Sequence, residues 1–267
     1  MTDRTFAIAR LPGFASIAVT VFILLYLPIA MLVVFSFNAG DSVAIWEGFS
    51  LRWYPEAWQN EAVKQATLRS LQIATSAAII ATAVATMAAL GTTRRRQTKG
   101  QSFVYLMINQ PLMVPEIVTA VALLIFFSSI KVATGYQGLG YLVVAHAAFC
   151  TPFAYLPIRA RLAGMDLSLE TASADLYATR WQTFRYVTLP LVMPGAIAGL
   201  MLAFVTSLDN VVITLFVKSA GQDTLPTYML AQIRRSVSAE VNAISTLLLL
   251  LTVVLLTAFF LITRKRT

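Results

Sequence analysis

The segment GMDLSLETASADLYATRWQTFRYVTLPLVMPG, Gly164 to Gly195, is a polar connection between two apolar stretches, and it is longer than a turn between membrane helices requires. Leu169, Ala172 and Leu176 recur at intervals of three and four residues, which predicts a short helix with one apolar stripe over Asp166–Leu176. A compact helix outside the membrane that is tied to two spans can transmit motion from a partner. We therefore expect this segment to be a docking surface on the cytoplasmic side.

The second half of the segment predicts a bend followed by another helix. Tyr177–Thr179 interrupts the apolar spacing, and Trp181–Pro190 carries apolar side chains up to a proline boundary. We expect this second helix to act as a lever into the next span, with Leu189 and Pro190 at its end. The alternative interpretation is an amphipathic loop that lies at the membrane surface and binds no partner.

Composition sets the class of protein. Of the 267 residues, 58% are hydrophobic and 12% charged, and the mean hydropathy is +0.75. A soluble domain carries about 25% charged residues. The net charge of +8 is better explained by basic residues beside membrane spans than by nucleic-acid binding. The single cysteine, Cys150, excludes an intramolecular disulfide.

Six apolar stretches are each long enough to cross a hydrocarbon core of about 30 Å at about 1.5 Å per helical residue. The first is interpreted as a retained span, because its apolar core is too long for a signal peptide and no small-residue cleavage site follows. We expect an all-α polytopic membrane protein with a single transmembrane domain over residues 1–267. The stretches are Gly13–Phe37, Ala62–Thr92, Phe103–Ser128, Leu139–Ile158, Leu191–Val217 and Val241–Thr263.

Basic residues predict the orientation, because they concentrate in cytoplasmic loops. With both termini cytoplasmic, the inner segments hold 13 of the 20 basic residues, while the first outer loop carries four acidic ones. The run Arg94–Arg96 is interpreted as a topology anchor. The inner basic residues are Arg4, Arg10, Arg94, Arg95, Arg96, Lys99, Arg159, Arg161, Arg180, Arg185, Arg264, Lys265 and Arg266.

Two carboxylates fall inside predicted spans, where each costs roughly 2.5–3.5 kcal/mol on insertion scales. Glu116 lies in the third span beside Pro111 and Pro115, which loosen a helix and free its carbonyls. Asp209 lies in the outer half of the fifth span. We expect these residues to line a pathway for a cationic solute, since Coulomb attraction offsets lost hydration. The candidate pathway residues are Glu116, Ser207, Asp209 and Asn210.

Other interpretations of these polar residues stay open. Glu116 and Asp209 could instead make structural hydrogen bonds or ion pairs between spans. A proton-coupled secondary transporter could use Glu116, His146 and Asp209 as a relay, although six spans are few for that class and no internal repeat is visible. His146 alone fits a packed, hydrogen-bonded histidine better than a relay. A membrane scaffold without transport activity is a third possibility.

The polar segment resembles the "EAA" loop of importer-type ABC transporter permeases, whose pattern is E-A-A-x-x-x-G, then roughly ten residues, then an apolar residue, one further residue and Leu-Pro. Thr171-Ala172-Ser173 stands at the E-A-A positions, Tyr177 at the glycine, and Val187-Thr188-Leu189-Pro190 at the end. The missing glutamate leaves Glu170 one place earlier. Because tyrosine replaces the glycine, any left-handed turn at Tyr177 would be strained.

The resemblance covers nearly the whole chain and is closest to the spermidine/putrescine subfamily, through FSFN, WEGFSLRWY and GAIAGLMLAFVTSLDNVVITLFV. It implies six transmembrane helices of the type I importer permease fold in the inner membrane, with a cytoplasmic coupling helix. It also implies three kinds of partner: a second related permease, two copies of a cytoplasmic ATPase and a periplasmic solute-binding protein. The residues expected to contact the ATPase are Glu170, Thr171, Ala172, Ser173, Asp175, Leu176, Tyr177 and Ala178.

The chain lacks the features of an enzyme. It has no G-x-x-x-x-G-K-[ST] phosphate loop, no metal-ligand cluster and no Ser/His/Asp set. We therefore expect it to bind no cofactor, with ATP and Mg²⁺ used by the ATPase partner. A polyamine is the expected cargo; another amine, an opine or a different small organic solute is the alternative.

Overall fold

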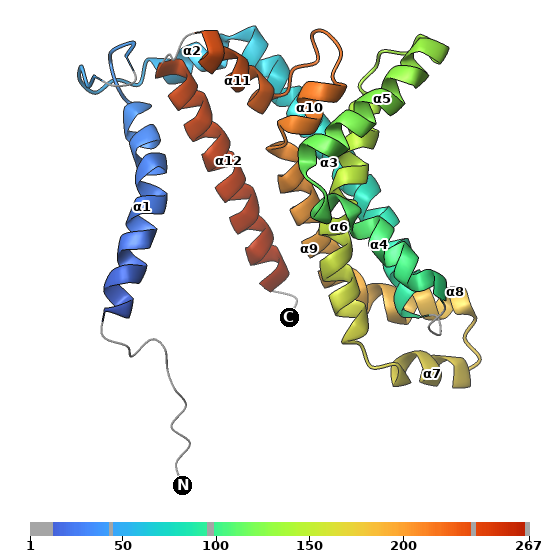
Figure 1. The fold of residues 1–267 in the computed structure, drawn as a ribbon. Coiled ribbons are helices and arrows are strands. Elements are labelled where there is room, and N and C mark those ends of the chain that lie inside the picture. The colour runs from blue at the N-terminus through green and yellow to red at the C-terminus, as the bar shows by residue number, and fades with distance from the viewer. Residues whose placement is uncertain (1–12, 43–44, 95–98, 236–238, 265–267) are drawn as a thin grey trace. The chain divides into compact units, whose positions relative to one another are not determined.

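The computed structural model describes residues 13–42, 45–94, 99–235 and 239–264 (Figure 1). Arg4, Arg10, Arg95, Arg96, Lys265 and Arg266, which entered the orientation argument, lie outside these ranges. The helices are α1 (Phe14–Phe35), α2 (Trp53–Gln59), α3 (Glu61–Thr93), α4 (Lys99–Met113), α5 (Glu116–Thr134), α6 (Gly140–Ala163), α7 (Ser168–Asp175), α8 (Arg180–Thr183), the π-helix η2 (Phe184–Thr188), α9 (Leu189–Leu208), α10 (Val212–Val217), α11 (Leu225–Arg235) and α12 (Ala239–Arg264).

The expected all-α membrane fold is confirmed. Six helices among the described residues are long and apolar enough to cross a membrane. Extended pairing over the same residues is limited to one bridge between Asn38 and Phe49. The candidate spans are Ala15–Phe35, Glu61–Thr93, Glu116–Thr134, Gly140–Ala163, Arg180–Leu208 and Ala239–Ala258.

Two of the expected spans are interrupted rather than continuous. The stretch predicted as one helix over Phe103–Ser128 is divided between α4 and α5 at residues 114–115, because proline lacks an N–H and disfavours helical geometry in the residue before it. The stretch predicted over Leu191–Val217 is divided between α9 and α10 at residues 209–211. Both interruptions place polar residues at helix ends.

The chain divides into two compact units. One contains the residues up to Glu61 together with Met229–Leu251, and the other contains Ala62–Tyr228 together with the residues from Thr252 onward. In the first unit, Trp53 packs with Ala239 and Ala243, and the Asn60 amide donates to the Glu240 carboxylate over 3.0 Å. The second unit contains α3 to α10 and holds most of the buried core.

Small residues allow close helix packing in the second unit. The Ala/Thr-rich α3 buries a stripe of alanines that includes Ala81, Ala85 and Ala89, and such small side chains let helices pack closely. Gly195 and Gly199, four residues apart on α9, contact α6. A Cβ added to Gly199 would lie 2.7 Å from the carbonyl oxygen of Ala154. The α6 and α9 backbones therefore approach too closely for any side chain at this position.

Gly199→Val tests this contact. Overpacking against backbone costs about 1–3 kcal/mol, and about 1 kcal/mol shifts the melting temperature of a chain this size by roughly 2–4 °C. We expect the detergent-solubilised variant to melt several degrees lower in a thermal-shift assay read by size-exclusion chromatography. Gly91→Ala on α3 is the matched control, because a Cβ there meets nothing within 4 Å. Equal melting temperatures for both variants would contradict the packing argument.

Candidate functional site

A hydrogen bond joins the break between α4 and α5 to the break between α9 and α10. Glu116 lies in the first turn of α5, directly after the break at Pro115, and Asn210 lies between α9 and α10. The Asn210 side-chain amide donates to the Glu116 carboxylate across 94 residues of sequence. The structure thus brings together two of the four residues predicted to line a pathway.

Asn210 also caps α10. Its side-chain oxygen accepts from the Ile213 N–H over 3.0 Å, and its main-chain carbonyl accepts from the Thr214 hydroxyl over 3.0 Å. These bonds satisfy backbone groups that a helix break leaves free, which is what permits non-helical backbone at membrane depth. The Asn210 side chain therefore stabilises the break between α9 and α10 and also binds the Glu116 carboxylate.

His146 extends the network into α6. Its Nε2 lies 3.0 Å from the Thr214 hydroxyl, and its Nδ1 lies 2.8 Å from the Ser207 hydroxyl. Because the Thr214 hydroxyl already donates its one hydrogen to Asn210, the geometry fits a neutral ring protonated on Nε2. His146 is 1% exposed and contacts hydroxyls, as expected for a packed histidine. Ser207 is likewise buried and bound to His146.

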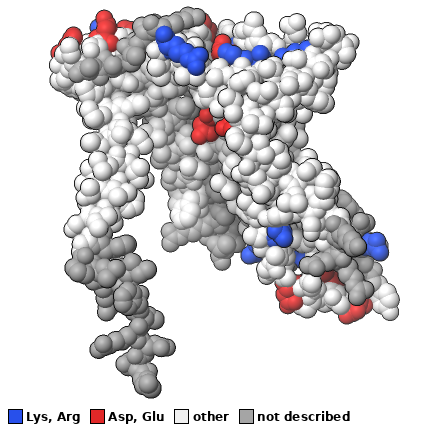
Figure 2. All heavy atoms as spheres, viewed as in Figure 1, with Lys and Arg blue, Asp and Glu red and all other residues white. Residues whose placement is uncertain are grey.

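Asp209 stands beside this network and is exposed. It is close enough to Glu116 for the two carboxylates to interact electrostatically. Within the described residues, neither forms an ion pair with lysine or arginine. Figure 2 shows one group of acidic side chains apart from the charged groups at the helix ends. Two carboxylates without a counterion form a site that attracts cations.

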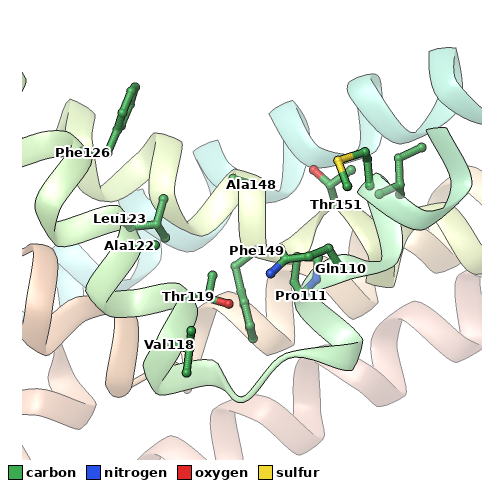
Figure 3. A pocket seen from close by; sticks show the side chains of 12 residues that line it. Gln110, Pro111, Val118, Thr119, Ala122, Leu123, Phe126, Ala148, Phe149 and Thr151 are labelled. Carbon is green, nitrogen blue, oxygen red and sulfur yellow. The ribbon is translucent and has the colours of Figure 1, made fainter. Parts of the chain in front are cut away.

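A groove of about 560 Å³ lies against the break between α4 and α5 (Figure 3). Its lining from α4, α5 and α6 is mostly apolar, with polar groups at Gln110, Thr119 and Thr151. The Thr119 hydroxyl oxygen is buried and has no hydrogen-bond partner among the described residues. Thr119 is one helical turn from Glu116 on α5, so the groove begins next to the acidic site. The prolines of the sequence predict a loosened helix here, but the groove also needs side chains of α6, which only the tertiary structure brings to it.

The polar loop folds as two short helices at a bend. α7 covers Ser168–Asp175, within the helix predicted over Asp166–Leu176. The Ser168 hydroxyl and N–H both donate to Asp166, which lowers the pKa of that exposed carboxyl. Tyr177 has φ of +60°, so this non-glycine residue does adopt the left-handed conformation that is strained for it. Thr179 and Gln182 then form a reciprocal capping box that starts α8. Its S/T-x-x-Q signature is present in the sequence and is a usable signal for this helix start.

The lever differs from a single helix. α8 continues into η2, a π-helix over Phe184–Thr188, and then into α9, with Leu189 and Pro190 in the first turn of α9. π-Helical segments are rare and occur frequently at functional sites.

One side of the loop exposes apolar side chains. Leu176 is 82% exposed, Tyr177 96% and Trp181 66%, and Leu169 is also exposed. Large exposed apolar side chains on a polar loop are typical of a protein interaction surface. Of the other residues expected to contact an ATPase, the exposed ones are Thr171, Ala172 and Asp175, and the half-buried ones are Ser173 and Ala178.

The Glu170 side chain binds other parts of the same chain. Its Oε1 accepts from Arg94 Nε over 3.1 Å and from the Thr188 hydroxyl over 2.9 Å. Arg94 is therefore an ion-pair partner of the loop, a role that its interpretation as a topology anchor did not include.

Together, broken membrane helices around paired carboxylates and a helical loop outside the spans define a membrane permease. Residues 81–265 match the family model "Binding-protein-dependent transport system inner membrane component". The chain belongs to this family, and it is a multi-pass inner membrane protein.

Characterised relatives cover most of the chain. The putrescine transport system permease protein PotI of Escherichia coli (strain K12) is 38% identical over 91% of this chain and 87% of its own length. The spermidine/putrescine transport system permease protein PotC of the same strain is 36% identical over 91% of this chain and 90% of its own length. These relatives are transport permeases rather than enzymes.

Solved structures show the same fold. A bacterial ABC transporter involved in the import of the acidic polysaccharide alginate matches with a TM-score of 0.72 at 15% identity, over 94% of this chain and 93% of that one. The MetNI methionine ABC transporter in inward-facing conformations matches with a TM-score of 0.66 at 20% identity, over 80% of this chain and 98% of that one. The expected importer permease fold is thereby confirmed.

Tyr177→Gly tests the strain in the loop. Glycine adopts positive φ without the penalty of a Cβ, which is about 1–2 kcal/mol. The Tyr177 side chain is 96% exposed, so its removal sacrifices little packing within the chain. We expect tryptic cleavage after Arg180 to slow severalfold, measured by gel densitometry of the solubilised protein. Ala178→Gly, one residue on at ordinary φ, should instead speed cleavage; acceleration by both variants would contradict the argument.

Proposed function

We propose that this chain forms half of the translocation pathway of an ATP-driven importer for a polyamine or similar cationic solute. The observation that carries the proposal is the position of two carboxylates at helix breaks, Glu116 at the start of α5 and Asp209 directly after α9. Neither forms an ion pair with a basic side chain in the described part of the chain. A di- or polyamine carries several positive charges and would neutralise both carboxylates. The names of the relatives, which cite putrescine and spermidine, support this cargo.

The partners that we propose follow from the family. A second related permease completes the pathway, a periplasmic solute-binding protein delivers the cargo, and two copies of a cytoplasmic ATPase drive the cycle. The chain itself binds no cofactor, and ATP with Mg²⁺ is used by the ATPase. The exposed side of the loop, with Leu176, Tyr177 and Trp181, is the surface that we assign to ATPase docking.

The proposed orientation has both termini in the cytoplasm and α7 on the same side. Basic residues support it: Arg159 and Arg161 lie in the last turns of α6, and Arg94 directly follows α3. Positive charge at these ends agrees with the preference of basic residues for cytoplasmic loops.

Leu176→Glu tests the docking surface. The side chain is 82% exposed, so a charge there should leave the fold intact while placing an unpaired carboxylate in an apolar interface. We expect co-purification of the ATPase with the tagged complex to fall at least tenfold. Trp58→Glu on α2 is the control, since it also charges a largely exposed apolar side chain, on the outer side in the proposed orientation. Undiminished ATPase capture by Leu176→Glu would contradict the docking assignment.

Glu116→Gln and Asp209→Asn test the pathway. Each substitution removes one negative charge, and the amide oxygen introduced by Glu116→Gln can still accept from Asn210. We expect ATP-driven uptake of radiolabelled putrescine by proteoliposomes to fall about tenfold or more for each variant, which corresponds to about 1.4 kcal/mol. Assembly and thermal stability should stay near those of the parent protein.

Glu56→Gln, on exposed α2, is the matched control for these amides. Normal uptake by both pathway variants would overturn their assignment. Uptake that disappears with the proton gradient, rather than with ATP, would support a secondary transporter instead. Transport of another small solute in place of putrescine would change the cargo and leave the class of transporter intact.

A further inference from the structure

The inner side of α7 is fixed to the helix bundle by one carboxylate. Glu170 Oε1 accepts from Arg94 Nε, directly after the last residue of α3, and from the Thr188 hydroxyl, at the end of η2. We refer to Arg94, Glu170 and Thr188 as the clasp. A single oxygen atom thus joins α7 to the end of η2, 18 residues away, and to the residue that follows α3, 76 residues away.

Arg94 adds a fourth segment. Its Nη1 donates to the carbonyl of Leu162 in the last turn of α6 over 3.3 Å, and its Nη2 lies 3.7 Å from the sulfur of Met165. The planar guanidinium presents several donors in a fixed arrangement, so one side chain can hold neighbours at defined angles. The clasp therefore connects α7 to the ends of α3, α6 and α9, where α9 follows Thr188 directly.

The clasp is shielded from solvent. The Arg94 and Glu170 side chains are 19% and 22% exposed, and Thr188 is 5% exposed. An ion pair this far buried is screened less by water and salt than a surface pair, and loss of one partner leaves the other charge uncompensated. The pair is therefore suited to hold a mechanical connection during a transport cycle.

The remaining connections of α7 are weaker. Ser173, on the same side of the helix as Glu170, lies 2.8 Å from the Thr183 hydroxyl on α8. The chain segments on either side, residues 164–167 and 176–179, are non-helical and can bend. Without the clasp, a force applied to the exposed side of α7 would be absorbed by these segments before it reached the spans.

We propose that Arg94 and Glu170 are positioning residues that make α7 rigid with the ends of α3, α6 and α9. Motion of a docked ATPase is then converted into motion of three spans at once. The inference rests on the proposed function, since it requires an ATPase that docks on the loop. It differs from direct recognition, because Glu170 acts within this chain and contacts no partner.

The test uses the complete transporter in proteoliposomes, with the permeases, the ATPase and the binding protein. ATP hydrolysis stimulated by the binding protein and uptake of labelled putrescine are measured in the same vesicles, and ATPase capture is measured on the purified complex. For Arg94→Gln and Glu170→Gln we expect ATPase capture within about twofold of the parent and uptake per ATP reduced at least about fivefold. The double variant Arg94→Glu/Glu170→Arg, which exchanges the two charges, should recover a substantial part of the lost uptake per ATP.

Two further variants keep the test decisive. Thr188→Val removes only the hydroxyl and should lower uptake per ATP by a smaller factor, even if the charge variants assemble poorly. Arg69→Gln is the matched control, because Arg69 is also on α3 but donates to Gln65 of the same helix. It should leave every measurement unchanged.

The outcomes separate the clasp from the proposed function. An unchanged ratio of uptake to hydrolysis in Arg94→Gln, Glu170→Gln and Thr188→Val would overturn the clasp, as would failure of the exchange to recover any coupling. Lost ATPase capture in Glu170→Gln alone would also overturn it and would make Glu170 a direct ATPase contact. Absence of ATPase capture in the parent protein would contradict the proposed function itself.

Discussion

The structure depends on the satisfaction of backbone polar groups where membrane helices stop. In hydrocarbon a free N–H or C=O costs several kcal/mol, so a helix can be interrupted only where other groups replace its bonds. Asn210 supplies these groups between α9 and α10 and, with the same side chain, holds Glu116 at the start of α5. One side chain, that of Asn210, therefore both stabilises the break between α9 and α10 and holds the Glu116 carboxylate in place.

Much of the fold follows from local sequence, and much of the site does not. The apolar stretches and the start of α7 at Ser168 depend on nearby residues and are predictable from them. The interruption at 209–211 carries a weaker signal, because Asp209 and Asn210 favour turns and helix starts but no proline marks the break within the apolar stretch. The pairing of Asn210 with Glu116 spans 94 residues and requires tertiary structure. Gly195 and Gly199 do carry a usable signal, since small residues four apart favour close helix contact.

Different residues of the loop after α6 bind within the chain and project into solvent. Glu170 and Ser173 bind within the chain, whereas Leu176 and Tyr177 project away from it. A basic run beside a span is usually a topology signal, which is why sequence reasoning assigned Arg94 no further role. Its ion pair with Glu170 shows that one arginine of such a run can also be a specific structural contact.

The π-helix η2 connects the loop to α9 and also determines the direction in which the loop extends from the α9 axis. Successive residues of an α-helix turn by about 100° around its axis, and a π-helical turn accommodates roughly one residue more than an α-helical one. Rewinding Phe184–Thr188 as α-helix without a deletion would therefore rotate α7 and α8 by about a quarter of a turn around α9, whereas rewinding it with one residue removed would leave their direction nearly unchanged. The angular position of the loop around α9 thus depends on the winding of this segment, independently of the side chains that the loop carries.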